Sequence, residues 1–522
     1  MSKKFYAAML MAALWVLGGA MASASGQRQG VETKRDAVPM PTVNTDSVMK
    51  HIIELASETY EGRMAGTTGY DRAAGYAGRV LERYGAKLQK TAGFAVECNE
   101  VENCKFNVRR IPLGGGQSSS SGGAATSEGD RRVFTLGNEF CCAGVTGRGY
   151  VDAQLVFCGY GVDDGLFNEY RDVDVKGKVV VVLTAVPDWL PTTVTDRYRT
   201  LRDKARTAER HGAIGMLAVN VGTTCLPDEA QARVWCGELP HLATFPILHL
   251  TLDCGRELFD GEKKPLDYCI DQLATAHKVQ SFSMLKKGEI DVNARYRQQA
   301  PTGNVVALLE GSDKSLAKEY IVMGACLDGQ GIQGETCLFP GADINASGVA
   351  TLLETARVLS DKNYRPKRSI LFVLFSGGEQ QYLGSRHFVE TYPQLRRVEA
   401  FVGVQNVGYG DSVVVLGTAK YPALCDNLIM HDTVAGRNNV VRGGEATMPR
   451  GDARAFDAVG IPSMVVATHD GMHYTRVTGD IWENIDRRIL GITAQLVAET
   501  AAELGEGLYM GRSLSSRGNR RE

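Results

Sequence analysis

The sequence predicts an α/β fold in which a central sheet carries helices on both faces, and residues 320–388 contain the pattern that predicts it. Residues 320–323 form a short apolar run that is rich in β-branched side chains and ends at Gly324, which is typical of a buried strand. Residues 369–375 form a second run with almost no polar residue, as expected for a strand covered on both faces. Between the two runs, apolar residues recur at helical spacing at Val349, Leu352, Leu353, Ala356 and Leu359.

An acidic residue follows each predicted strand. Asp343 lies in GADINASG, residues 341–348, and Glu379 lies in SGGEQQYLGS, residues 376–385. Open α/β sheets form their sites from the loops at the carboxyl ends of neighbouring strands, so the two carboxylates are placed to face one crevice. In the alternative interpretation, Asp343 caps the following helix and Glu379 is a solvated loop residue.

Four motifs in order resemble the M28 family of zinc aminopeptidases: GACLDGQG, GADINASG, PKRSILFVLFSGGEQQYLGS and AVGIPSMVV, beginning at residues 324, 341, 366 and 458. That family usually shows a Gly-Ala-His-x-Asp loop, then Gly-Ala-Asp-Asp-Asn-Ala-Ser-Gly, then Phe-Ser-Gly-Glu-Glu. The resemblance implies a mixed central sheet with helices on both faces. It extends to a Glu-Gly-Arg-x-x-Gly loop near the N-terminus, where Glu61 and Arg63 are expected to be structural.

The resemblance also implies five metal-ligand positions, and only two of them keep the family's residue. The matching residues are Cys326 in place of His, Asp343, Glu379, Gln405 in place of Asp, and Thr475 in place of His. His473 lies two residues before the last of these positions. Neutral Gln and Thr side chains hold a pair of dications less well than the charged or imidazole ligands they replace, so at most one zinc ion is expected.

The general-base position of the family falls on Gly378, which has no side chain to accept a proton from water. Such a proton transfer typically contributes roughly 10²–10⁴-fold to rate. Asp328, which would orient the missing His, and Asp452, which matches an Asp beside the family's site, both remain. No catalytic residue is therefore assigned.

Cys326 has three interpretations. It is a zinc ligand in a reduced site with Asp343, Glu379 and His473. Alternatively, it forms a disulfide bond with Cys337 in the same loop, or it is a buried free thiol that fills space.

Composition and the N-terminal segment indicate an exported protein. Lys and Arg total 58 against 60 for Asp and Glu, a net charge of -2 that gives no electrostatic reason to expect nucleic acid. Residues 1–24 read as a signal peptide with two lysines, an apolar stretch and Ala-Ser-Ala as the cleavage site. We expect a periplasmic or extracellular protein that is not inserted in a membrane after cleavage.

The chain has 12 cysteines, which makes disulfide bonds plausible in an exported protein. Closeness in sequence makes three pairs the first candidates: Cys98 with Cys104, Cys225 with Cys236, and Cys254 with Cys269.

The domain organisation follows from composition and from the resemblance. The M28-like domain comprises residues 45–112 and 275–505, and an insert at 131–274 resembles a protease-associated domain. The Gly/Ser-rich residues 114–130 are expected to be a flexible linker, and residues 506–522 a disordered tail. Residues 27–44 are expected to be a loose arm. Thr45, Asp46 or Ser47 is expected to cap the helix that follows.

Three functions remain open at this level. The favoured one is an M28-like protein with a degraded metal site, impaired in catalysis, that binds a peptide or protein. The second is an active aminopeptidase with one zinc and a relocated base, Asp328 or Asp470. The third is a binding module that acts through the inserted domain.

Overall fold

The computed structural model describes residues 42–111, 131–221, 240–361, 364–443, 451–470, 477–507 and 509, all within one compact unit. Several expectations fall outside these residues: the signal peptide, the linker at 114–130, most of the arm, the tail apart from 506, 507 and 509, Cys225, Cys236, His473 and Thr475. Among the helices that the structure describes, none is long and apolar enough to cross a membrane.

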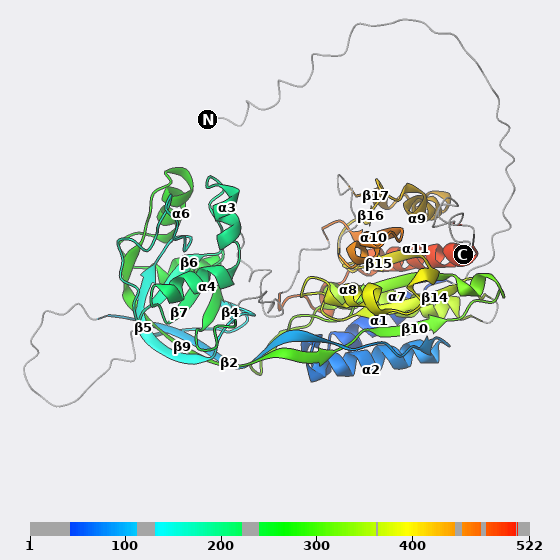
Figure 1. The fold of residues 1–522 in the computed structure, drawn as a ribbon, viewed down its shortest axis with the longest axis horizontal. Helices are drawn as coiled ribbons and strands as arrows, with labels where there is room; N and C mark the ends of the chain where they lie inside the picture. Colours follow the sequence, from blue (N-terminus) through cyan, green and yellow to red (C-terminus); the bar gives the residue numbers. More distant parts are fainter. Residues whose placement is uncertain are drawn as a thin grey trace, which may run out of the picture. The chain divides into compact units, whose positions relative to one another are not determined.

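The core domain is built on an eight-stranded mixed sheet (Figure 1). Its strands, in spatial order, are β1 (Lys87–Leu88), β10 (Val305–Leu309), β14 (Ser369–Phe375), β11 (Tyr320–Cys326), β15 (Val398–Val404), β18 (Ser463–Thr468), β16 (Val413–Leu416) and β17 (Val440–Arg442). The four central strands, from β14 to β18, are parallel to one another. Their carboxyl ends therefore lie at the same edge of the sheet.

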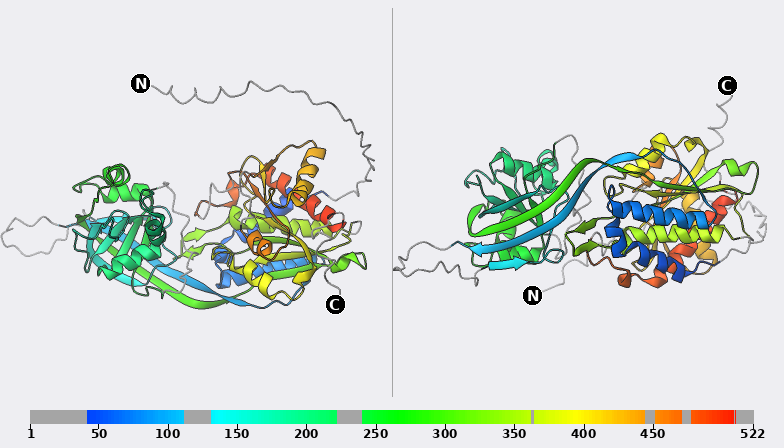
Figure 2. Two further views of the ribbon diagram at one scale, coloured as in Figure 1. Left: turned by 45° about the horizontal axis from the view of Figure 1, so that its top comes forward. Right: turned by 90° about the horizontal axis from the view of Figure 1, so that it is seen from below.

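Helices cover both faces of this sheet, as the sequence predicts. One face packs against α1 (Thr45–Leu55), α2 (Thr68–Arg83), α7 (Gly348–Leu359), α9 (Pro422–Val434) and α11 (Arg487–Gly505), and the other against α8 (Leu383–Thr391) and α10 (Ala453–Ala458). Strand β14 shows the reason: Ile370, Phe372 and Leu374 pack on the first face, and the residues that alternate with them pack on the second. Figure 2 shows the blue α1 and α2 beside the yellow-green α7.

Helix α1 begins at Thr45, before the start that any of the three expected caps, Thr45, Asp46 or Ser47, would give. Its N-cap is Asn44, whose side-chain oxygen accepts hydrogen bonds from the backbone of Asp46 and Ser47. The expected caps, Thr45 to Ser47, lie inside the first turn instead. Several N-cap residue types occur in a row here, and only the backbone geometry distinguishes among them.

The inserted domain contains most of a ten-stranded sheet. Its path is β13 (Cys337–Phe339), β12 (Gly331–Gln333), β2 (Phe94–Arg110), β9 (Phe282–Thr302), β5 (Gly149–Phe157), β6 (Val179–Leu183), β7 (Gly215–Val219), β8 (Ile247–Leu250) and β4 (Phe140–Cys142), with β3 (Arg131–Phe134) beside β2. Helices α3 (Thr192–Thr195), α4 (Leu201–Arg210), α5 (Leu252–Leu258) and α6 (Leu266–Thr275) belong to the same domain.

Strands β2 and β9 join the two domains as one long antiparallel pair (Figure 2). Phe106 of β2 and Met284 and Ile290 of β9 pack in the core of the inserted domain. The same strands continue to Phe94 and Thr302, beside the core domain. The two strands thus run through both domains, and the boundaries that the sequence analysis placed at residues 112 and 275 stay a prediction. A continuous strand pair has no change of composition that marks such a boundary.

Candidate functional site

The candidate site lies at the carboxyl edge of the core sheet, where three neighbouring parallel strands end. Strand β11 ends at Cys326, β14 is followed by Gly378 and Glu379, and β15 is followed by Gln405. The fourth contributor, Asp343, lies in the helical turn Ala342–Ser347 that leads into α7. These residues thus lie in segments that follow neighbouring strands or lead into α7, while His473 and Thr475 are outside the described residues.

Cys326 and Gly378 fit against each other at this edge. The Cys326 thiol is buried and donates a hydrogen bond to Asp452 Oδ2 at 3.0 Å. A Cβ atom built on Gly378 would lie only 2.4 Å from the Cys326 Sγ and 3.1 Å from Asp328 Oδ1. Burial and the neighbouring Asp452 raise the pKa of the Cys326 thiol well above its usual range. The space next to residue 378 is therefore filled by an un-ionised thiol.

Asp328 holds the turn that follows β14. Its carboxylate accepts hydrogen bonds from the backbone N–H of Gly378 at 3.1 Å and of Glu379 at 3.4 Å. Burial, and then the charge of Glu379, raise the pKa of Asp328 to about 8. The residue that would orient an imidazole in the M28 family here supports the backbone of a neighbouring loop.

Asp343 is held by contacts on both its backbone and its side chain. Its Oδ1 accepts a hydrogen bond from the backbone N–H of Gly408 at 2.7 Å. Asp480 accepts hydrogen bonds from the backbone N–H of Asp343 at 2.7 Å and of Ile344 at 3.0 Å. Burial, and then the charge of Asp480, raise the pKa of Asp343 to about 8. Asp343 is therefore not simply the cap of α7, for which no side-chain cap is present.

Arg63 connects two of the site loops by hydrogen bonds to their backbone. Its side chain is fully buried, and its guanidinium donates to the carbonyl oxygens of Leu327 at 3.1 Å and Gly341 at 2.8 Å. It also donates to the carbonyl oxygens of Leu55 and Pro340. This is the structural role expected of Arg63, and it fixes the segments that carry Asp328 and Asp343.

The remaining candidates occupy different environments. Glu379 is buried, with 7% of its surface exposed. A Cβ atom built on Gly451, the residue before Asp452, would lie 2.8 Å from the Gln405 Oε1. Asp470, one of the two candidate relocated bases, has an exposed side chain that pairs with His469 at 3.5 Å. The other, Asp328, is engaged by the two backbone amides described above.

The described residues do not by themselves fit a zinc ion. Within the described ranges, no three His, Cys, Asp or Glu side chains are arranged as a group that would hold a metal. One oxygen of Asp343 and the thiol of Cys326 are engaged in hydrogen bonds within the protein. The one-zinc set with His473 stays a prediction because His473 is outside the described residues.

The structure adds one residue that the sequence analysis missed. Asp480 anchors the turn that carries Asp343 through two backbone amides, and its own pKa is raised to about 6 by burial. It lies 137 positions from Asp343, outside any of the recognised motifs. No local signal in the sequence distinguishes it from other loop aspartates.

All ten cysteines in the described part of the chain are buried and unpaired in this structure. Cys326 is not bonded to Cys337, because its thiol faces Asp452. The candidate pairs Cys98 with Cys104 and Cys254 with Cys269 are likewise not formed. In this structure Cys326 is a buried thiol that is not bonded to Cys337, and its interpretation as a zinc ligand stays a prediction.

The core domain has the mixed α/β sheet with helices on both faces that the resemblance to the M28 family implied, and a second domain is inserted in it. Family models agree: "Peptidase family M28" matches residues 304–501 and "PA domain" matches residues 151–258. The chain therefore contains an M28 peptidase-like region and a PA-domain-like region, the two regions that the motifs predicted.

Curated proteins with similar sequence include transferrin receptors and a probable zinc metalloprotease. Human transferrin receptor protein 2 is 33% identical over 121 residues, which cover 22% of this chain and 14% of the receptor. Transferrin receptor protein 1 of Gallus gallus is 31% identical over 174 residues, 31% of this chain and 20% of the receptor. A probable zinc metalloprotease of Pyrenophora teres f. teres is 36% identical over 110 residues, 20% of this chain and 22% of that protein. The chain thus matches between 14% and 22% of the length of these relatives.

Solved structures match over nearly the whole chain. BSAP, a zinc aminopeptidase from Bacillus subtilis, superposes with a TM-score of 0.61 at 18% identity, covering 89% of this chain and 96% of its own. A Peptidase M28 precursor from Shewanella amazonensis SB2B gives 0.58 at 16% identity, with coverages of 90% and 99%. At these identities the likeness shows the fold alone.

Proposed function

We propose that this chain is an exported M28-fold protein that binds peptides at the carboxyl edge of its core sheet and is impaired in hydrolysis. The observation that carries the proposal is the contact between Cys326 and Gly378. The position that the resemblance assigns to the general base has no side chain, and the space beside it is filled by the Cys326 thiol.

The chemistry of the neighbouring groups supports the same conclusion. Gln405 supplies a neutral amide where the family has a carboxylate, and Asp328 is engaged by backbone amides. A two-metal hydrolase needs negative ligands to hold two dications close together, and a positioned base to take a proton from water. Neither requirement is met by the described residues.

Binding without efficient turnover is consistent with the relatives. The curated relatives include proteins named as receptors as well as one named as a metalloprotease. Glu379 remains as a buried carboxylate at the edge. A carboxylate in such a place complements the positive amino terminus of a peptide, because hydrogen bonds between ionised groups are the stronger ones.

The main experiment measures metal content, turnover and peptide binding on the same purified protein. Metal analysis is combined with a panel of aminoacyl chromogenic substrates, with and without added zinc, and with fluorescence anisotropy on peptides with free or acetylated amino termini. We expect less than one zinc per chain, no turnover above background, and binding that favours a free amino terminus.

Two variants give the matched comparison. The double variant Asp343→Asn/Glu379→Gln should lose peptide binding, whereas Glu310→Gln, an exposed carboxylate beside Lys87, should keep it. Stoichiometric zinc with turnover that Glu379→Gln abolishes would establish the active one-zinc enzyme instead. Binding that survives the double variant would place the binding function in the inserted domain.

Export is tested separately by the N-terminus of the mature protein. The Ala22-Ser23-Ala24 pattern predicts a mature chain that begins at Ser25 when the full chain is expressed in a bacterium and the periplasm is recovered. Recovery of the intact N-terminus from the cytoplasm alone would contradict export.

A further inference from the structure

Four buried cysteines come together where the inserted domain meets the core domain. They are Cys104 on β2, Cys141 and Cys142 on β4, and Cys337 on β13. We propose that they form two disulfide bonds, Cys104 with Cys142 and Cys141 with Cys337, when the protein folds in an oxidising environment.

Strands β2 and β4 contact each other through a pair of phenylalanines and a pair of cysteines. The rings of Phe106 and Phe140 meet edge to face with their centroids 5.7 Å apart. Cys104 lies two residues before Phe106 on β2, and Cys142 lies two residues after Phe140 on β4. The thiols of these two cysteines are hydrogen-bonded to each other. All four side chains belong to the same buried cluster. The Phe pair and the Cys pair thus show that these two strand faces are opposed.

Cys141 points to the other side of β4, because neighbouring side chains on a strand alternate between its faces. There it packs in a small buried cluster with Cys337 and Phe339. Each of the two adjacent thiols on β4 therefore has its own partner.

Two further contacts hold Cys337 in this position. Gln333, its register partner on β12, accepts from the backbone N–H of Cys142 at 2.8 Å and donates to its carbonyl oxygen at 2.9 Å. Gly137, in the turn that precedes β4, also lies against this thiol. A Cβ atom built on Gly137 would be 3.1 Å from the Cys337 Sγ.

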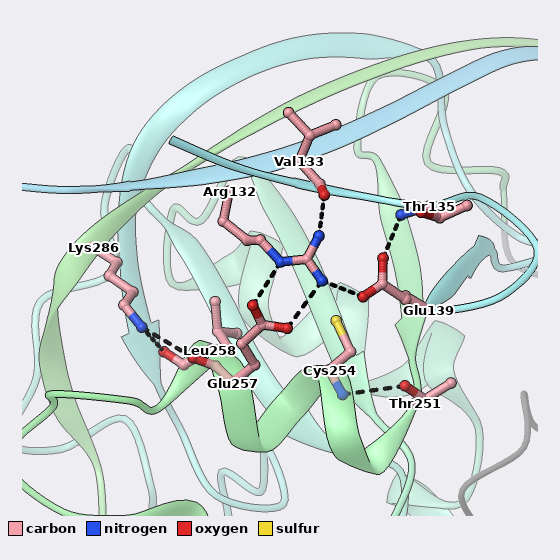
Figure 3. A network of polar contacts seen from close by, with 9 residues as sticks. All are labelled: Arg132, Val133, Thr135, Glu139, Thr251, Cys254, Glu257, Leu258 and Lys286. Carbon is pink, nitrogen blue, oxygen red and sulfur yellow. Dashed lines mark hydrogen bonds and ion pairs between the residues drawn. The ribbon is translucent and has the colours of Figure 1, made fainter. Parts of the chain in front are cut away.

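The turn before β4 is itself anchored within the inserted domain (Figure 3). Arg132 donates hydrogen bonds to Glu139 and to Glu257, and Glu139 Oε2 accepts from the backbone N–H of Thr135 at 2.7 Å. Glu139 immediately precedes β4, so this network fixes the strand that carries the two adjacent thiols. Cys254, also drawn in Figure 3, has its backbone N–H capped by Thr251.

Disulfide pairing suits this cluster better than a metal centre does. Among the described residues, no three Cys, His, Asp or Glu side chains are arranged to hold a metal ion. Burial also raises the pKa of Cys337 to about 12 and that of Cys141 and Cys142 well above the usual range. Thiolate is the reactive form, so pairing takes place during folding, before the cluster is closed.

Each bridge forms by thiol–disulfide exchange with a small disulfide such as oxidised glutathione. One cysteine thiolate attacks the oxidant and forms a mixed disulfide, which releases one glutathione thiol. The second cysteine then displaces the other glutathione. Two S–H bonds are lost and one S–S bond is formed, while the oxidant takes up two electrons and two protons.

The second bridge has a consequence for the candidate site. Cys337 opens β13, which leads through Gly341 to Asp343, and Arg63 holds the same segment. A bond from Cys141 would tie the inserted domain to the segment that carries Asp343. The disulfide proposal depends on the proposed export in one respect only: export would bring the protein into an oxidising compartment.

The test uses the full chain made in a bacterial host with an oxidising cytoplasm and, for comparison, in an ordinary reducing host. Because the protein is oxidised in the cytoplasm of the first host, disulfide formation is tested whether or not the protein is exported. Free thiols are alkylated in denaturant, and the unreduced protein is cut with trypsin and a glutamyl endopeptidase. This digestion yields three cysteine peptides that lack Cys98 and Cys326. Cys104 is in residues 103–105, Cys141 and Cys142 are in 140–148, and Cys337 is in 336–354.

The expected result in the oxidising host is one species that links all three peptides, with loss of their alkylated forms. Cys141→Ser should leave only 103–105 joined to 140–148, and Cys142→Ser only 140–148 joined to 336–354. Cys158→Ser, at another buried cysteine, is the control and should leave the pattern unchanged. Alkylated peptides from the oxidising host, other pairings, or bound zinc that the single variants remove would overturn the proposal. None of these outcomes depends on peptide binding or turnover.

Discussion

The Sγ of Cys326 lies where a side chain at Gly378 would begin, because a Cβ at residue 378 would be only 2.4 Å from it. The thiol is kept there by its hydrogen bond to Asp452. Residues 326 and 378 therefore depend on each other, and a larger side chain at one is compatible with the structure only if the other moves or shrinks.

This contact predicts the effect of Gly378→Ala. The added methyl group overlaps the Cys326 thiol, so the free energy of unfolding should fall by about 1–3 kcal/mol. In the double variant Gly378→Ala/Cys326→Ala the loss should be smaller than the sum of the two single losses. Urea denaturation of the four proteins measures both quantities.

Gly165→Ala is the matched control, since no atom lies within 4 Å of its Cβ position. Its stability should stay within about 0.5 kcal/mol of the wild type. Additive losses in the double variant would show that Cys326 and Gly378 are independent.

Arg63 is predicted to be among the most sensitive positions of the core domain. Arg63→Ala leaves four buried carbonyl oxygens without their donor, so the free energy of unfolding should fall by about 3 kcal/mol or more. Arg63→Lys should restore only part of this loss, because an ammonium cannot reproduce the planar fork. Arg72→Ala, which breaks an exposed pair with Glu61, should cost about 0–1 kcal/mol. Equal losses at the two arginines would contradict the structural role of Arg63.

Glu169 in the inserted domain predicts a dependence of stability on pH. Its side chain is fully buried and accepts a hydrogen bond from the backbone N–H of Val162 at 3.0 Å, and burial raises its pKa to about 8. In the unfolded chain the carboxyl group titrates near its ordinary value, so the folded state binds the proton more tightly. The contribution to stability is full below about pH 4.3 and is lost as the pH rises toward 8.

The variant Glu169→Gln isolates this contribution. The free energy of unfolding of the wild type, relative to that of the variant, should fall between pH 5 and pH 8 by up to about 1.4 kcal/mol per pH unit. Denaturant titrations of both proteins at several pH values measure the difference. A constant difference across that range would show that Glu169 does not change its proton affinity on folding.

Cys326→Ser tests whether Cys326 is paired. Because the Cys326 thiol faces Asp452 and not Cys337, the number of thiols titrated in denaturant without reductant should fall by one. A serine hydroxyl can also donate to Asp452, so we expect a stability loss of about 1 kcal/mol or less. A rise of one in the thiol count would instead indicate a bond to Cys337, and a fall in zinc content would indicate a metal ligand.

Much of the core domain was predictable because its signals are local. The apolar runs at 320–323 and 369–375 became β11 and β14, and the helical spacing after Gly348 became α7. The cap at Asn44 was not predicted, and the boundaries given for the two domains stay a prediction. Adjacent capping residues look alike in sequence, and a strand shared by two domains carries no composition change.

The amino-acid sequence alone determined the two central strands and the helix between them, the motif positions and the loss of a side chain at residue 378, since each of these depends on residue identity and short-range periodicity. Only the tertiary structure decided which polar groups meet there. Cys326 and Asp452 are 126 positions apart, and Asp343 and Asp480 are 137 apart. Contacts at such separations arise from the packing of the parallel strands and their loops, and no local pattern encodes them.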